Sequence, residues 1–338
     1  MEMGIAAVGT AFGERLDVAQ TAHEYGLEPA AALRMGYESY HRLKRGDTAT
    51  ALAGRAAGQA LQEAGIGIDG VDLIVVGNSD MPEYLGWDPS AAVARELGAR
   101  DIPTVLFTQS CAAWAPALDH AAGAMALDPG METVLLVLVN AVSDAHSNRM
   151  DFNATVASDG AAAAVLRRGH PRLRRLASAQ VTNPEYADFF RIEYGGSAAP
   201  VAPTGAGNRE LDPKIAIYHY FNRDPQRFEE FEEEIRGRLA HVVDLALTRA
   251  GRKRADLARL IYINDNQKAI HEAAEALGLP PDRSNAALAR GLGHLGAADQ
   301  LVSLWRHVEA GELTDGQLVA LAGVAAPGMH WMCTLIEV

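Results

Sequence analysis

The sequence has 338 residues, 49% of them hydrophobic, so it can bury a large core, and its length suggests roughly two domains of ordinary size. Its formal net charge of −13 opposes nonspecific binding to nucleic acid, because most of the surface would repel a phosphate backbone. The longest apolar run, near 133–142, is far shorter than the roughly 20 residues that span a bilayer, and residues 1–12 lack the basic start of a signal peptide.

Along the chain we expect a first strand near 1–12 and then two series of elements in the same order. Each series has a helix of small and apolar residues, a continuous apolar strand that ends in polar residues, two further helices and a second strand. The first series is predicted at 51–65, 71–80, 89–98, 108–127 and 133–142, and the second at 236–251, 257–266, 269–278, 291–311 and 317–326.

The repeated order predicts a duplicated α/β fold with layers α/β/α/β/α and two mixed, mostly parallel sheets. We divide the chain into an N-terminal half, 1–170, and a C-terminal half, 171–338. Between the halves, 192–213 is rich in Gly, Pro and Ala without a clear period. This segment is predicted to be a loop, acting either as a lid over a pocket or as a surface excursion without a catalytic part.

Cys111 follows an apolar strand and precedes a helix, where the helix dipole favours a thiolate. The repeat gives His294 the equivalent place in the second half, so a pseudo-twofold axis would bring the thiol and the imidazole together. The alternative for Cys111 is a buried, inert thiol, which is the role we expect for Cys333. Two cysteines give no disulfide framework and suit a reducing cytoplasm.

Three separated motifs carry a family resemblance: SCAAWAPAL around Cys111, SDGAAAAVL at 158–166 and GHLGAADQ at 293–300. Together they resemble ketoacyl-ACP synthase III of the thiolase superfamily over nearly the whole chain. The resemblance implies that Cys111 accepts an acyl group from a phosphopantetheine thioester, on acyl carrier protein or coenzyme A, without a permanently bound cofactor or metal. It also implies a homodimer.

The chain departs from the family at two positions. The family has histidine where this chain has Asn264, in NDNQ, and asparagine where this chain has His294, in Gly293-His294. This exchange argues against decarboxylative condensation, and GHLGAADQ looks like the ketosynthase-like acyltransferases of antibiotic biosynthesis. A neutral His294 suits the deprotonation of an acceptor hydroxyl, whereas a capping or core histidine is the structural alternative.

Further site residues follow from the chemistry of acyl transfer. Asp299, on the first turns of the helix after His294, is predicted to orient the imidazole, with Asp265 as its rival and a plain helix-terminus carboxylate as the alternative. For the oxyanion hole the resemblance implies the Cys111 N–H and the turn before the last strand, where we choose Gly328 over Ala326. Asn264 either binds the acyl group or thioester, or caps a strand end.

We therefore expect an acyltransferase that forms an ester or amide on a natural-product acceptor. The alternatives are an acyl shuttle between coenzyme A and acyl carrier protein, a decarboxylative 3-ketoacyl synthase, or a silent ketosynthase-like subunit. An acidic carrier protein would need a basic entrance. The candidate residues for that entrance are Arg149, Arg191, Lys214, Arg223 and Arg227.

Overall fold

The computed structural model describes residues 2–151, 154–209, 213–326 and 329–338. The strands are β1 (Met3–Phe12), β2 (Glu14–Asp17), β3 (Ser39–Arg42), β4 (Leu73–Asn78), β5 (Thr104–Phe107), β6 (Thr133–Asn140), β7 (Gly160–Arg168), β8 (Arg174–Thr182), β9 (Leu257–Ile261), β10 (Leu318–Ala325) and β11 (His330–Glu337). The α-helices are α1 (Val18–Thr21), α2 (Pro29–Leu33), α3 (Ala49–Glu63), α4 (Pro89–Glu96), α5 (Trp114–Leu127), α6 (Pro213–Tyr220), α7 (Pro225–Arg249), α8 (Gln267–Ala276), α9 (Ala286–Leu292) and α10 (Asp299–Glu309). Among the described residues, no helix combines the length and apolarity that crossing a membrane requires.

The predicted duplication is present in the order of the elements. Helix α3, strand β4, helices α4 and α5 and strand β6 recur as α7, β9, α8, α10 and β10. Within the described residues, nine strands form one sheet in the order β5-β4-β6-β7-β1-β8-β11-β10-β9. Strands β1 and β8 join through a single residue pair, Gly4 with Arg174, so the sheet consists of two parts that barely touch. The division at residue 170 falls in the turn between β7 and β8.

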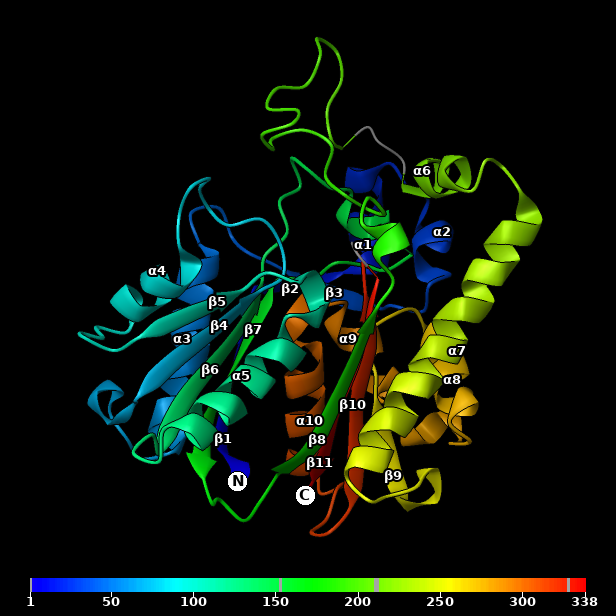
Figure 1. Ribbon diagram of the computed structural model, residues 1–338. Helices are drawn as coiled ribbons and strands as arrows, with labels where there is room; N and C mark the ends of the chain where they lie inside the picture. Colours follow the sequence, from blue (N-terminus) through cyan, green and yellow to red (C-terminus); the bar gives the residue numbers. More distant parts are fainter. Residues whose placement is uncertain (1, 152–153, 210–212, 327–328) are drawn as a thin grey trace.

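The expected layers are confirmed. Helices α3 and α4 cover the outer face of the first part of the sheet, and α7 covers that of the second part, with α8 packed on α7 (Figure 1). Helices α5 and α10 lie between the two parts, where α5 contacts β4, β6 and β11 and α10 contacts β1, β7 and β9. One continuous core accordingly joins Val8 and Leu136 of the first part to Val319 and Leu321 of the second.

Helix α3 lies directly on β1 because both surfaces are made of small residues. A Cβ at Gly9 would lie 2.2 Å from the Ala56 carbonyl oxygen and 2.5 Å from the Ala60 nitrogen. Ala56 and Ala60 are fully buried, as the alanine-rich helical pattern predicts. The close approach of the two backbones therefore requires glycine at this strand position.

The sheet is mixed, as expected, but the prediction of mostly parallel strands is wrong. Of the eight pairings described within the large sheet, only β4 with β5, β4 with β6 and β9 with β10 are parallel. Strand β11 begins only a few residues after β10 and pairs with it antiparallel, and β7 returns antiparallel beside β6. Continuous apolar runs reveal burial on both faces but not the direction of the neighbouring strand.

Arg149 is buried, which contradicts its proposed place at a basic entrance. Its guanidinium donates to Asp159 at 2.8 Å, to Asp144 at 3.1 Å and to the Val142 carbonyl at 2.7 Å, and only 1% of the side chain is exposed. Asp159 in turn accepts from the Val142 and Leu43 backbone N–H groups. Arg149 therefore joins the SDGAAAAVL segment to the loop after β6 and cannot contact a partner protein.

We expect Arg149→Met to lower the free energy of unfolding by about 3 to 5 kcal/mol, because it leaves the buried carboxylate of Asp159 without its cation. Urea unfolding followed by circular dichroism measures the loss. Arg191→Met is the control, since the exposed pairs of Arg191 with Asp188 and Glu193 are screened by solvent and should contribute little to stability. Equal stability of Arg149→Met and the wild type would show that the pair is dispensable.

Candidate active site

Cys111 lies at the turn between β5 and α5, as the sequence predicts. It belongs to a short 3-10 helix, η3 (Ser110–Ala112), that leads into α5. The preceding residue, Ser110, has a φ of 50°, an uncommon conformation for a residue with a side chain. The Cys111 thiol is 3.8 Å from the Val324 carbonyl oxygen at the end of β10, so the nucleophile candidate lies where both halves of the chain meet.

His294 is held by its backbone against the start of the SDGAAAAVL segment. Its N–H donates to the Val156 carbonyl at 2.9 Å, and its carbonyl accepts from the Ser158 N–H at 2.8 Å. Gly293, with a φ of 69°, comes so close to Ser158 that a Cβ there would lie 2.9 Å from the Ser158 Cβ. Two of the three motifs are therefore in direct backbone contact, and this contact fixes the place of His294.

Asp299 is fully buried at the start of α10 and is the hydrogen-bond partner of His294. Its Oδ2 is 2.6 Å from His294 Nδ1 and also accepts from the Asn264 N–H at 2.7 Å. Its Oδ1 accepts from the Leu295 N–H at 2.6 Å. The Nδ1–Asp299 contact leaves Nε2 as the ring nitrogen available for chemistry.

Asp265, the rival orienting residue, has its carboxylate turned toward its neighbour. Its Oδ1 accepts from the backbone N–H of Asn266 at 2.7 Å and from the Asn266 amide at 3.0 Å. Burial raises the pKa of Asp265 to about 6, against the opposing effect of the Asn266 N–H. In the geometry of the site, Asp299 rather than Asp265 contacts the imidazole.

The electrostatics of His294 favour the imidazolium. Burial alone disfavours the charged ring, but the Asp299 carboxylate and, after it, the Cys111 thiol outweigh that cost, so the pKa of His294 is raised well above its usual value. Cys333 differs: it is fully buried in the apolar core under α7, and burial raises the pKa of its thiol. Both cysteines are free, as expected.

Asn264 is engaged by the protein on both sides of its amide. Its Nδ2 donates to the Gly293 carbonyl at 3.0 Å, and its Oδ1 accepts from Asn285 at 2.8 Å and from Ser303 at 3.3 Å. The residue is fully buried and is not part of the cavity wall described below. These contacts favour the structural alternative for Asn264, in which it supports the loop that carries His294.

A cavity of about 1070 Å³ opens onto Cys111 and His294. Its walls include the polar ends of β4 and β6, the aromatic side chains of Phe189, Phe190 and Tyr220, and Ala326 from the turn before β11. Gly328, the preferred oxyanion residue, lies outside the described residues, and its role stays a prediction. Among the described residues no group of acidic, histidine or cysteine side chains has the arrangement of a metal site.

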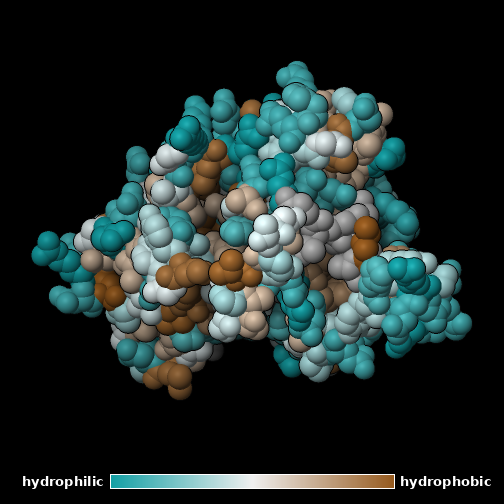
Figure 2. All heavy atoms as spheres, turned by 90° about the horizontal axis from the view of Figure 1, so that it is seen from above, coloured by the Kyte–Doolittle hydropathy of each residue, from teal (hydrophilic) through white to brown (hydrophobic). Residues whose placement is uncertain are grey.

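The base of the predicted lid lines this cavity through Ile192, Glu193, Tyr194 and Asn208, whereas 195–207 project from the molecule at the top of Figure 1. Figure 2 looks down on this end and shows hydrophobic side chains between polar ones. Two of the exposed hydrophobic residues, Ile215 and Tyr220, also line the cavity. The segment thus borders the opening, and its function as a lid remains a prediction.

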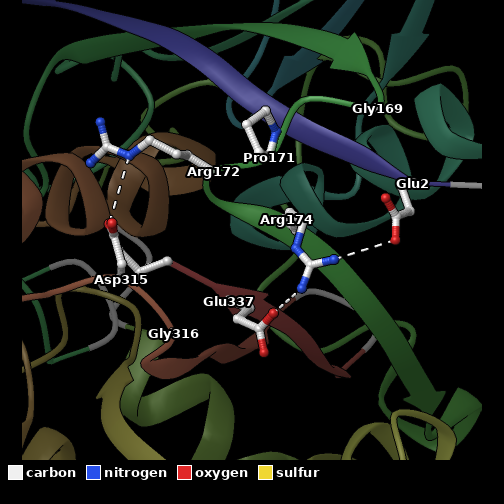
Figure 3. Close-up of a pocket in the computed structure, with 9 residues that line it drawn as sticks. Glu2, Gly169, Pro171, Arg172, Arg174, Asp315, Gly316 and Glu337 are labelled. Carbon is white, nitrogen blue, oxygen red and sulfur yellow. Dashed lines mark hydrogen bonds and ion pairs between the residues drawn. The ribbon is translucent and has the colours of Figure 1, made fainter.

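A second, smaller cavity of about 410 Å³ lies at the opposite end of the molecule, beside both chain termini (Figure 3). Arg174 forms ion pairs there with Glu2 and Glu337, and Arg172 approaches Asp315 at 3.9 Å. As far as the structure describes them, its walls contain neither a cysteine nor a histidine. We therefore place the candidate active site in the larger cavity.

Comparison with known proteins agrees with the resemblance in the motifs. The family profile described as 3-oxoacyl-[acyl-carrier-protein (ACP)] synthase III C terminal matches residues 247–338. The beta-ketoacyl-[acyl-carrier-protein] synthase III of Coxiella burnetii is 26% identical over 308 residues, which cover 90% of this chain and 88% of that protein. Over most of its length the chain is therefore similar to ketoacyl-ACP synthase III proteins.

Solved structures agree along the entire chain. ChlB3, described as an acyltransferase, superimposes with a TM-score of 0.87 at 26% identity and covers 100% of this chain and 98% of its own. The 3-oxoacyl-(acyl carrier protein) synthase III of Pseudomonas aeruginosa has a TM-score of 0.80 at 22% identity, with coverage of 100% and 98%. The thiolase-like fold class is therefore confirmed.

We expect Asp299→Asn to lower the pKa of His294, because the opposing effect of burial would then lack its main counterweight. Titration of the imidazole by NMR measures the change. Since the folded-state pKa is raised, the charge on His294 stabilises the wild type below the unfolded value of roughly 6.5, and this contribution is lost as pH rises through the folded pKa.

Asp265→Asn is the matched control for this titration, and its effect on His294 should be the smaller one. A larger fall of the His294 pKa in Asp265→Asn than in Asp299→Asn would transfer the orienting role to Asp265.

Proposed function

We propose that this protein is an acyltransferase that carries an acyl group on Cys111 from a phosphopantetheine thioester to a hydroxyl or amine of a small-molecule acceptor. The observation that carries the proposal is a buried imidazole that contacts Asp299 through Nδ1 and shares a cavity with a thiol. This is the arrangement of cysteine nucleophile, histidine base and orienting carboxylate found in other acyl-transferring enzymes.

In the first half-reaction Cys111 takes the acyl group. The raised pKa of His294 favours an imidazolium beside the thiol, and the sulfur attacks the thioester carbonyl of the donor as a thiolate. A bond forms between the carbonyl carbon and Cys111 Sγ, the bond to the phosphopantetheine sulfur breaks, and His294 gives its proton to the departing sulfur. His294 is then neutral.

The second half-reaction uses the neutral imidazole. An acyl-cysteine carries no negative charge, so the contribution of Cys111 to the high pKa of His294 disappears on loading. His294 then removes the proton of the acceptor hydroxyl as its oxygen attacks the carbonyl carbon. The carbon–oxygen bond forms, the bond to Cys111 breaks, and the thiolate and the imidazolium are restored together.

Negative charge on the carbonyl oxygen requires N–H donors in both half-reactions. The Cys111 N–H and the turn before β11 remain our choice, with Gly328 as the preferred second donor. The contact of the Cys111 thiol with Val324 O and the presence of Ala326 in the cavity wall support this choice for the turn. Asn264 is assigned a positioning role in this proposal.

The donor, the assembly and the compartment follow from the family resemblance and the sequence. We propose acyl carrier protein or coenzyme A as the source of the phosphopantetheine thioester, a homodimer as the assembly, and the reducing cytoplasm as the compartment. Arg191, Lys214 and the exposed Arg223 and Arg227 remain candidates for a basic entrance, and the side chain of Lys214 is not among those that the structure describes. An acyl shuttle between coenzyme A and carrier protein would use the same residues and differ only in the acceptor.

We expect His294→Ala to slow the discharge of the acyl group more than its loading, because an acceptor hydroxyl has a far higher pKa than a thiol. Single-turnover mass spectrometry follows the acyl mass on Cys111 during both steps. Loss of the base should lower the discharge rate by about 100-fold or more.

The controls separate the proposal from its rivals. Cys111→Ala should gain no acyl mass, whereas Cys333→Ala should load normally. Discharge by His294→Ala at the wild-type rate would remove His294 from the mechanism. A silent subunit would gain no acyl mass even as wild type.

Malonyl donors should not be decarboxylated. In the family a histidine and an asparagine hold the malonyl thioester, and in this chain the two residue types have changed places. The Asn264 amide, at the position of the family's histidine, is engaged by Gly293, Asn285 and Ser303. We expect malonyl to be transferred intact or ignored in an assay with labelled malonyl thioester. Rapid release of labelled carbon dioxide with formation of a 3-ketoacyl product would favour the condensing enzyme instead.

A further inference from the structure

One wall of the active-site cavity is formed by the carboxyl ends of two neighbouring parallel strands. Strand β4 ends at Asn78 and β6 at Asn140, and the N–H of Ser79 donates to the Val139 carbonyl at 3.0 Å. This pairing brings Asp80 and Asn140 to the same edge of the sheet. Both residues line the cavity that contains Cys111 and His294.

Asn140 presents a hydrogen-bond acceptor at this wall. The residue is only 4% exposed, and its Nδ2 donates to the Ser158 carbonyl at 2.9 Å, which fixes the orientation of the amide. Its Oδ1 has no hydrogen-bond partner among the described residues. A Cβ at Gly296 would lie 2.6 Å from this oxygen, so only a glycine two residues after His294 fits beside Oδ1.

Asp80 presents a carboxylate without a cation. Its Oδ1 accepts from the Met81 N–H at 2.7 Å, and no arginine, lysine or histidine of the described chain lies within ion-pair distance. Burial raises the pKa of Asp80, and the Met81 N–H, Arg149 and His146 oppose this effect. Arg149 is itself bound to Asp144 and Asp159. A desolvated carboxylate of this kind is stabilised by a cationic hydrogen-bond donor.

The cavity wall carries more acidic than basic side chains. The basic residues of the wall, as far as it is described, are Arg191, which is already paired with Asp188 and Glu193, and the histidines His146 and His294. The acidic residues of the wall are Asp80, Asp151, Asp188 and Glu193. A positively charged ligand is therefore favoured over a neutral one, and a carboxylated ligand is disfavoured.

We propose that Asp80 and Asn140 bind an ammonium group of the acceptor, so that the acceptor is an amino alcohol whose hydroxyl receives the acyl group. This inference rests on the proposed acyltransferase function. Both side chains offer acceptor oxygens to the cavity, and an ammonium supplies three donors and the missing charge. A protonated amine is not a nucleophile, so the product is an ester formed through His294 and Cys111 as described above.

Three small alcohols of similar shape test the charge preference: serinol, which is cationic, glycerol, which is neutral, and glycerate, which is anionic. Binding to the unacylated enzyme is measured by saturation-transfer NMR, and discharge of acyl-Cys111 is measured by mass spectrometry. We expect serinol to be preferred over glycerol by about tenfold or more, because hydrogen bonds to charged groups are the stronger ones. Glycerate should be the poorest ligand.

Asp80→Asn should reduce the preference for serinol to less than about twofold and leave glycerol binding nearly unchanged. Asp315→Asn, the same change at the second cavity, should retain the wild-type preference. If serinol and glycerol bind the wild type equally, or if neither binds detectably, the ammonium site is wrong. Persistence of the preference in a folded Asp80→Asn protein would contradict the role of Asp80.

The binding and discharge measurements distinguish this inference from the function on which it rests. A preference for serinol that depends on Asp80, without discharge to any of the alcohols, would support the ammonium site and count against the acyltransferase. Discharge to glycerol and serinol at equal rates would support the acyltransferase and overturn the ammonium site.

Discussion

The carboxylate of Asp299 has no contact with solvent, and its three hydrogen bonds determine much of the geometry around it. A buried carboxylate is costly unless donors surround it, and here they come from the backbone of Asn264 at the end of β9, the backbone of Leu295 and the ring of His294. The segment after β9, the loop that carries His294 and helix α10 therefore converge on one side chain. The position of the imidazole is a consequence of this convergence.

Duplication of the fold explains why a thiol stands opposite that imidazole. In each half a short 3-10 turn leads into a helix, η3 into α5 in the first half and η8 (Gly296–Ala298) into α10 in the second. The two helices share one apolar core between the two parts of the sheet. Cys111 precedes one helix and His294 lies just before the other, so packing of the helices brings the two functional groups into one cavity.

The sequence predicts this pairing well because repeat, motif and helix boundary point to the same residues. It also predicts the layers, because the apolar pattern of each helix and strand indicates which of its faces are buried. Strand direction is different: a buried apolar strand looks alike in parallel and antiparallel neighbourhoods, and the prediction of mostly parallel sheets was wrong.

The hydrogen-bond partners of buried polar side chains could not be predicted from the sequence either. Nothing local in the sequence reveals that Arg149 meets Asp159, ten positions away, in the interior, or that the Asn264 amide is engaged by Asn285 and Ser303. The polar ends of β4 and β6 were visible as Asn78-Ser79-Asp80 and Asn140, and polar residues at the carboxyl ends of parallel strands are a signal for a binding site. The structure adds that β4 and β6 are neighbours, so that these polar residues line the same side of the active-site cavity.

The contacts of Asn264 and His294 give a physical reason for the exchange of asparagine and histidine relative to the family. After β9, Asn264 supplies a backbone N–H to the carboxylate of Asp299 and a side-chain amide to the loop of His294. His294 is the only imidazole that contacts the Asp299 carboxylate in the described site. The pKa of His294 also depends on whether Cys111 carries a charge. In the proposed mechanism, loading removes the thiolate and lowers the pKa of His294, so that the ring becomes neutral and has a free site for the acceptor proton. One residue would thus serve as acid in the first half-reaction and as base in the second.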